Sequence, residues 1–64
     1  MSTITYTVII EIGEQVRRCE KLSKKEAARL IKAGLEHDAE EILWKRSDVP
    51  NVLFDYYDTV MYWY

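Results

Sequence analysis

Apolar and polar residues alternate near the start of the chain. Five apolar side chains occupy every second position, with threonines, one isoleucine and one glutamate between them: Ile4, Tyr6, Val8, Ile10 and Ile12. A period of two in a stretch rich in β-branched residues is typical of a half-buried strand. Gly13 and Glu14 follow and predict a hairpin turn. We therefore expect one strand over residues 3–12 and a returning strand over residues 15–22.

Apolar and polar residues do not alternate regularly in the returning strand, residues 15–22. Val16 and Leu22 would share one face with charged residues, and Cys19 would lie on the opposite face. Charged side chains of this kind are typical of an edge strand, where they discourage aggregation. We therefore place residues 15–22 at a sheet edge and leave their register open. Cys19 is interpreted as a small buried hydrophobe rather than a reactive thiol.

A capping box predicts the start of a helix after this strand. Ser23 is followed three residues later by Glu26, and an apolar stripe of alanine, leucine and isoleucine comes next. Gly34 suits the left-handed position that ends a helix. We expect a helix over residues 24–33. The alternative is a helix that runs through Gly34 to Trp44, with a glycine in its interior at a cost of about 1 kcal/mol.

The second half of the chain contains the pattern of a third strand, followed by a segment whose pattern fits either a strand or a helix. Ile42 and Trp44 alternate with Glu41, Leu43 and Lys45 within residues 40–46, and Pro50 and Asn51 indicate a turn. Residues 52–64 are rich in valine and aromatic residues, which favours a strand. Their apolar positions also follow a helical spacing, so a helix is the alternative. We prefer a strand that is kinked near residues 55–58.

These elements predict one α+β domain over residues 1–64. The expected layout is ββαββ: a mostly antiparallel sheet with one short helix, residues 24–33, packed on one face. A helix of ten residues is about 15 Å long and covers only part of one face of such a sheet. We therefore expect an uncovered face that carries large aromatic rings.

Aromatic residues concentrate near the end of the sequence. Six of the eight fall within residues 54–64, next to two aspartates. Tyrosine and tryptophan provide large, rigid contact areas and are enriched where proteins bind one another. The predicted partner-binding surface comprises Asp55, Tyr56, Tyr57, Asp58, Tyr62, Trp63 and Tyr64. Its acidic margin would attract a basic protein surface.

Charge is distributed unevenly around a net value of −2. Residues 1–34 hold seven basic and four acidic residues, whereas residues 35–64 hold two basic and seven acidic residues. An alternative nucleic-acid-binding face would use the basic residues Arg17, Arg18, Lys21, Lys25, Arg29 and Lys32. The aromatic residues that could stack on bases lie in the acidic half, which disfavours nucleic acid as a partner.

The sequence carries no motif for catalysis, cofactor binding or a metal site. One cysteine and one histidine exclude an intramolecular disulfide and the common zinc clusters. His37 lies among acidic residues, which we interpret as a solvated loop, with a divalent-cation site as the alternative. No apolar run approaches the roughly 20 residues of a membrane-spanning helix, and no secretory signal is evident. We expect a cytoplasmic protein that is not an enzyme and needs no metal or cofactor.

The leading functional expectation is a small interaction protein that binds another protein through its aromatic and acidic residues. In size and composition alone the chain resembles small phage-encoded inhibitors of host defence or transcription, anti-CRISPR proteins among them. Such an inhibitor would act in the host cytoplasm. One alternative is an obligate homodimer that buries the aromatic residues and has its function elsewhere. The other is nucleic-acid binding through the basic face.

Overall fold

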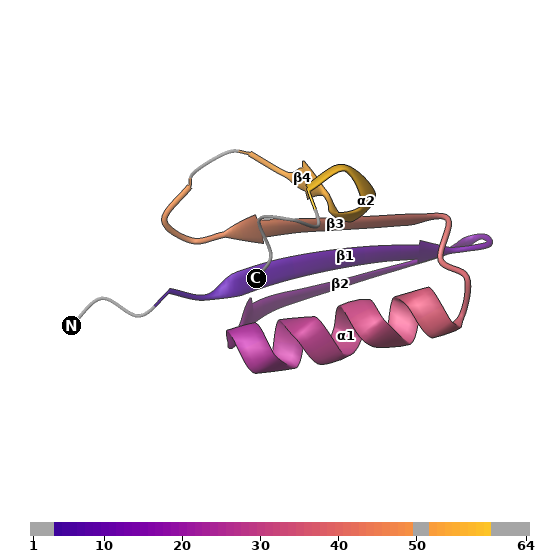
Figure 1. The fold of residues 1–64 in the computed structure, drawn as a ribbon, viewed down its shortest axis with the longest axis horizontal. Coiled ribbons are helices and arrows are strands. Elements are labelled where there is room, and N and C mark those ends of the chain that lie inside the picture. Colours follow the sequence, from indigo (N-terminus) through magenta and orange to yellow (C-terminus); the bar gives the residue numbers. More distant parts are fainter. Residues whose placement is uncertain (1–3, 50–51, 60–64) are drawn as a thin grey trace.

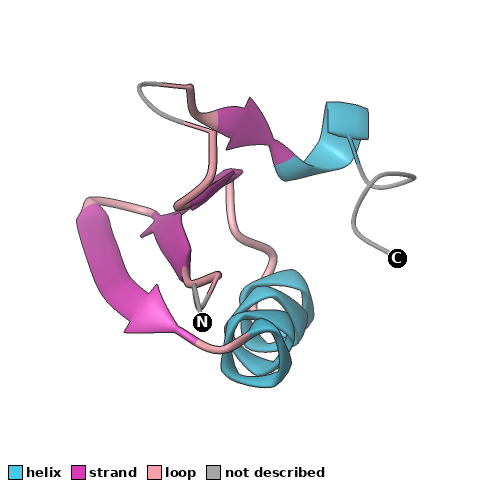
Figure 2. Cartoon of the chain, turned by 90° about the vertical axis from the view of Figure 1, so that its left-hand side faces the viewer, coloured by secondary structure: helices cyan, strands magenta, loops and turns pink. Residues whose placement is uncertain are grey.

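A computed structural model describes residues 4–49 and 52–59 of the chain. It contains four strands and two helices in the order β1 (Tyr6–Ile12), β2 (Gln15–Leu22), α1 (Lys24–Glu36), β3 (Glu41–Arg46), β4 (Phe54–Asp55) and α2 (Tyr56–Thr59). The strands form one antiparallel sheet in the order β2-β1-β3-β4 (Figure 1). The helix α1 lies along one side of this sheet (Figure 2). The α+β fold predicted from the sequence is confirmed.

The first two strands form a hairpin with a two-residue turn. Ile12 pairs with Gln15, and Gly13 between them has a φ of 59°. A positive φ at only the first central residue is typical of a type II′ turn, whose twist matches that of the flanking strands. The sheet order places β2 at an edge, as the sequence predicts.

A β-bulge near the end of β2 changes which side chains share a face. Val8 pairs with Cys19 and Tyr6 pairs with Leu22, so β2 has one residue more than β1 between these pairs. Lys21 takes a positive φ of 57° in this bulge. Because of the extra residue, Leu22 returns to the face of Cys19 and packs against the core. The expectation that Leu22 shares a face with Val16 is therefore wrong.

The core lies between the sheet and α1. Its buried side chains come from alternate positions of β1 and β3, from one stripe of α1, and from the segments that flank β3 and β4: Tyr6, Val8, Ile10, Ala27, Ile31, Ala39, Ile42, Trp44 and Tyr56. Among the described residues, the centroid of the Trp44 ring lies 4.9 Å from that of Phe54 and 6.4 Å from that of Tyr6. One aromatic cluster therefore fills the core beneath β3.

The helix α1 begins as predicted and ends later than predicted. Ser23 accepts a hydrogen bond from the Glu26 amide, and the Glu26 carboxylate accepts one from the Ser23 amide, which confirms the capping box. The expected end at Gly34 is wrong, because the helix continues to Glu36. Asp38 takes the left-handed conformation instead, with a φ of 54°. The amides of Asp38 and Ala39 donate to the carbonyls of Leu35 and Gly34, which is a Schellman motif.

The last described segment combines both structures considered from the sequence. It is a strand only at Phe54–Asp55, which pairs with β3, and it is helical over Tyr56–Thr59. The preference for a strand is thus correct for two residues, and the chain changes direction where a kink was expected. Within the described residues, no helix has the length and apolar character needed to cross a membrane.

Candidate protein-binding surface

Two of the predicted partner-binding residues have structural roles that leave them little exposed. Tyr56 is buried in the core. Asp55 is half-buried, and its carboxylate accepts a hydrogen bond of 2.9 Å from the Tyr57 amide. An acceptor at this position satisfies a free amide at the start of α2. Asp55 therefore fixes the turn that presents the next residues.

Tyr57 is the aromatic residue that this turn presents to solvent. Its side chain is 49% exposed, although its hydroxyl donates a hydrogen bond of 3.0 Å to the carbonyl of Ala39. Its ring also lies 6.1 Å from the buried ring of Tyr56. Tyr57 is consequently held at both ends of its side chain. A ring that is fixed in this way loses little conformational entropy when a partner covers it.

The hydrogen bond from Tyr57 joins the last described segment to the acidic loop between α1 and β3. Its acceptor, Ala39, stands between Asp38 and Glu40, and the Glu40 amide donates to the carbonyl of Glu11 on β1. Residues that are 18 positions apart in the sequence thereby meet at one end of the sheet. Three parts of the chain that contain acidic residues therefore meet there.

Strand register places three carboxylates on one face of the sheet near this end. Glu11 pairs directly with Glu41, and Asp55 pairs with Leu43, two residues along β3. Paired residues and residues two apart lie on one face, so these acidic side chains share the face that α1 does not cover. We name the acidic residues of this face, together with residues of the adjoining loop and of α2, the acidic–aromatic surface: Glu11, Glu40, Glu41, Asp55, Tyr57 and Asp58.

The uncovered face differs from the expectation that it would carry large rings. Within the described residues its centre is formed by the paired, half-buried side chains of Ile9 and Leu43. Trp44 and Phe54, paired with each other, lie on the opposite face and pack in or against the core. Tyr62, Trp63 and Tyr64 lie outside the described residues.

The six predicted basic residues do not form one surface. Lys25, Arg29 and Lys32 are exposed along one outer stripe of α1. Arg17 and Arg18 are consecutive in a strand and therefore point to opposite faces of β2. Arg18 forms an exposed salt bridge of 2.9 Å with Glu20, and Lys21 lies in the bulge. The basic residues thus divide among the helix and both faces of the edge strand.

The remaining candidate chemistry is not concentrated anywhere in the described structure. His37 is exposed and caps the end of α1 through its backbone amide, which donates to the carbonyl of Ala33. Among residues 4–49 and 52–59, no three histidine, cysteine, aspartate or glutamate side chains are grouped to hold a metal ion. Cys19 is half-buried on the face of the edge strand that is turned toward α1.

Sequence reasoning missed Glu11, Glu40 and Glu41 as members of the candidate surface. It assigned Glu40 and Glu41 to a solvated loop and to the start of a strand, and it assigned Glu11 to a polar strand position. The signal that unites them is the antiparallel pairing of β1 with β3. No local pattern contains that pairing. Compared with known proteins, the chain matches no family model, no curated protein sequence and no solved structure.

Proposed function

We propose that this protein is a non-enzymatic interaction module that binds a basic surface of another protein through its acidic–aromatic surface. The hydrogen bond between Tyr57 and Ala39 carries the proposal, because it joins an exposed, fixed ring to the acidic end of the sheet. Carboxylates around a rigid aromatic residue combine long-range attraction with a central contact area. That combination is typical of binding hot spots surrounded by charge.

The pairing of Glu11 with Glu41 supports a role beyond folding. Like charges directly opposite each other on neighbouring strands lower the stability of a sheet. This loss of stability matters more in a chain of 64 residues, because its core is small. A basic partner that covers this acidic pair would supply the compensating positive charge. Binding to such a partner would therefore explain why the chain holds two glutamates opposite each other.

Inhibition is the effect we propose for such binding. A small protein that covers a basic groove or patch of its partner blocks whatever anionic substrate normally occupies that patch. The same charge complementarity would accelerate association, because opposite charges steer the two molecules together. This proposal places the protein in the compartment of its partner, which we take to be the cytoplasm.

The test begins with capture of partners from a lysate of cells that encode or encounter the protein. Tagged wild-type protein is compared with Tyr57→Ala and Asp58→Lys, which alter the proposed surface. Lys25→Glu is the matched control, because it changes charge on the outer side of α1. Each partner that wild type retains is purified, and its dissociation constant is measured by titration calorimetry with all four proteins.

We expect Tyr57→Ala and Asp58→Lys each to weaken binding by at least about tenfold, as loss of a hot-spot contact does. Lys25→Glu should retain the affinity of wild type. Affinity should also fall as salt is added, because the attraction between charged surfaces is screened. A purified partner that binds the two surface variants as tightly as wild type contradicts the proposal. Loss of binding only in Lys25→Glu would favour the basic face instead.

A further inference from the structure

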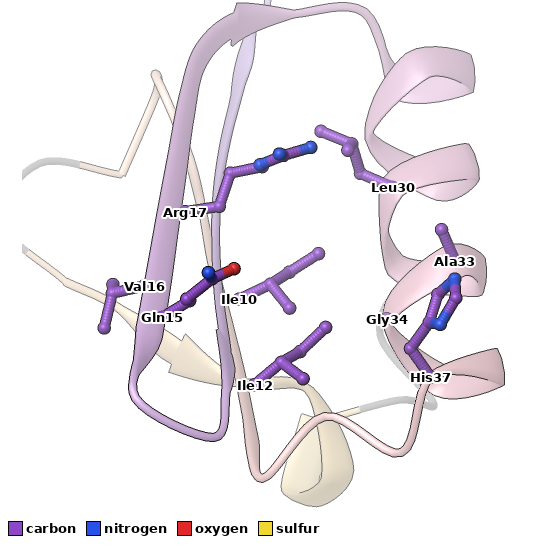
Figure 3. A pocket seen from close by; sticks show the side chains of 9 residues that line it. All are labelled: Ile10, Ile12, Gln15, Val16, Arg17, Leu30, Ala33, Gly34 and His37. Atoms are coloured by element: carbon purple, nitrogen blue, oxygen red, sulfur yellow. The ribbon is translucent and has the colours of Figure 1, made fainter.

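A groove separates α1 from the edge strand β2. The helix packs mainly on β1 and leaves the side of β2 that faces it open. Ile10 and Ile12 form the floor of this groove, Leu30 and Ala33 line it from the helix, and Arg17 lines it from β2 (Figure 3). Its volume is about 670 Å³. The groove is therefore apolar at its base and runs beside an open strand.

The backbone of β2 is arranged to accept another strand at this edge. A two-residue turn makes Ile12 and Gln15 a hydrogen-bonded pair, and bonded pairs then alternate along the hairpin. Val16 and Arg18 belong to the intervening pairs, so their amides and carbonyls point away from β1. Register is regular from Gln15 to Cys19. An extended peptide can form main-chain hydrogen bonds along such an edge.

Charge selects the kind of peptide that fits. Arg17 extends across the groove toward Leu30 (Figure 3), and no acidic residue is among those that line the groove. The neighbourhood is also basic, because β2 and α1 span residues 15–36, which hold seven basic and three acidic residues. Aliphatic side chains at alternate positions of an added strand match the isoleucine floor, and carboxylates between them point to the other face, on the side of Arg18. The complementary ligand is therefore an extended segment that contains both aliphatic and acidic residues.

A second copy of the chain fits this edge poorly. Pairing two β2 strands would bring together two segments that each hold three basic residues and one acidic residue, and like charges across strands are destabilising. The opposite edge of the sheet, β4, has only two residues. The β4 strand of a second copy is therefore too short to pair with all five positions of regular register in β2, residues 15–19. These features favour a segment of a different protein.

We infer that β2 binds an extended acidic–aliphatic segment of a partner protein as an additional strand of the sheet, with its aliphatic side chains in the groove beside α1. This site lies at the opposite edge of the sheet from β4 and adjoins the acidic–aromatic surface only where Val16 pairs with Glu11. The protein would then have two binding surfaces of opposite charge on one sheet.

Binding is tested with a dye-labelled octapeptide in which valine and glutamate alternate. A matched octapeptide of alternating valine and lysine is the control, and fluorescence anisotropy is measured with the full chain. We expect the glutamate peptide to bind at least about tenfold more tightly than the lysine peptide, because its charge complements β2. Equal affinity for the two peptides, or no binding of the glutamate peptide, would overturn the inference.

Variants separate strand addition from simple attraction between charges. Val16→Pro removes one outward amide, and proline is tolerated at an edge position whose N–H faces solvent. Val16→Ala keeps that amide and is the matched control. Ala33→Phe narrows the groove from an exposed helix position. We expect Val16→Pro and Ala33→Phe to weaken peptide binding at least about tenfold, and Val16→Ala to change it less than about threefold.

Amide hydrogen exchange of the wild-type protein provides a measurement that does not depend on any variant folding. With the glutamate octapeptide bound, the amides of Val16 and Arg18 should exchange more slowly, because the added strand accepts their hydrogen bonds. Unchanged exchange at both amides would overturn strand addition even if the peptide binds elsewhere. Light scattering on the free chain tests whether a second copy of the chain binds to β2 instead. A dimer in which the amides of Val16 and Arg18 are already protected would show that it does, and would overturn the inference.

Discussion

Gly34 lies where α1 packs closely against the sheet. A Cβ atom at this position would lie 3.2 Å from the Cδ1 atom of Ile10 and 3.3 Å from that of Ile42. The glycine therefore serves close packing rather than the end of the helix. Its low helix propensity, about 1 kcal/mol below that of alanine, is the cost of this approach.

A larger residue at position 34 should separate the helix from the sheet. We expect Gly34→Leu to lower the free energy of unfolding by about 1–3 kcal/mol, the usual cost of overpacking a core. Ala33→Leu, one residue earlier on the exposed side, is the matched control and should change stability by less than about 0.5 kcal/mol. Urea unfolding followed by circular dichroism measures both. Equal stability of the two variants would contradict the close approach.

Tyr57 should contribute to stability through its hydroxyl as well as to binding through its ring. Tyr57→Phe removes the hydrogen bond to Ala39 and keeps the ring. Because this bond is only partly buried, we expect a loss of about 0.5–1 kcal/mol in the free energy of unfolding. Chemical denaturation compares the variant with wild type. An unchanged free energy of unfolding would mean that water replaces Ala39 as the partner of the Tyr57 hydroxyl. The hydroxyl would then not fix the ring.

At the scale of elements, the two ends of α1 obey different constraints. Ser23 and Glu26 satisfy amides at its start through contacts that are three residues apart. Its end requires a left-handed residue, and Asp38 takes that conformation although glycine would do so with less strain. The helix thus runs past a suitable glycine because that glycine is needed at the sheet.

Substitution of Asp38 tests where the helix ends. We expect Asp38→Gly to raise the free energy of unfolding by up to about 1 kcal/mol, because glycine adopts a positive φ without a steric penalty. Glu36→Gly is the matched control: Glu36 is the last residue of the helix, and glycine there should lower stability by up to roughly 0.5–1 kcal/mol. Thermal unfolding measures both changes. Stabilisation by glycine at position 36 would place the end of the helix earlier.

The pairing of β1 with β3 makes a second prediction at this scale. Glu41→Lys replaces a like-charge pair with an opposite-charge pair across from Glu11. We expect the free energy of unfolding to rise by about 0.2–1 kcal/mol. The same variant should bind a basic partner more weakly, if the proposed function is correct. Urea unfolding and calorimetry report the two effects separately, and a decrease in stability would contradict the pairing.

At the scale of the whole molecule, stability depends on one small core. A domain of 64 residues has roughly 3–10 kcal/mol of total stability at typical values per residue. Trp44 is buried and contacts both Tyr6 and Phe54, so it joins β1, β3 and β4. The core thus has few side chains that could compensate for the loss of this one.

Removal of Trp44 should therefore unfold much of the population. Trp44→Ala is expected to cost about 3–5 kcal/mol, as for other large core residues. Leu53→Ala is the control, because Leu53 is 48% exposed and its loss should cost less than about 0.5 kcal/mol. Circular dichroism at 25 °C, followed by urea titration, compares the two. A fully folded Trp44→Ala protein with the midpoint of wild type would show that the core lies elsewhere.

The sequence alone determined the elements that depend on local patterns. The strand predicted over residues 3–12 is confirmed for Tyr6–Ile12 by β1, the capping box by the start of α1, and the charged edge strand by β2. Each of these features is defined by side chains a few residues apart. The α+β class follows from them, because a two-sided sheet and an amphipathic helix must bury their apolar faces against each other.

Only the tertiary structure decided the points that depend on distant contacts. Gly34 stays inside the helix because the sheet lies against it, and Leu22 faces the core because a bulge shifts its register. Glu11, Glu41 and Tyr57 join one surface through strand pairing and through a hydrogen bond across 18 residues. Local propensity differs by about 1 kcal/mol between the alternatives at such positions, and packing contributes as much or more. The fold was therefore largely readable from the chain, whereas the surface was assembled by its packing.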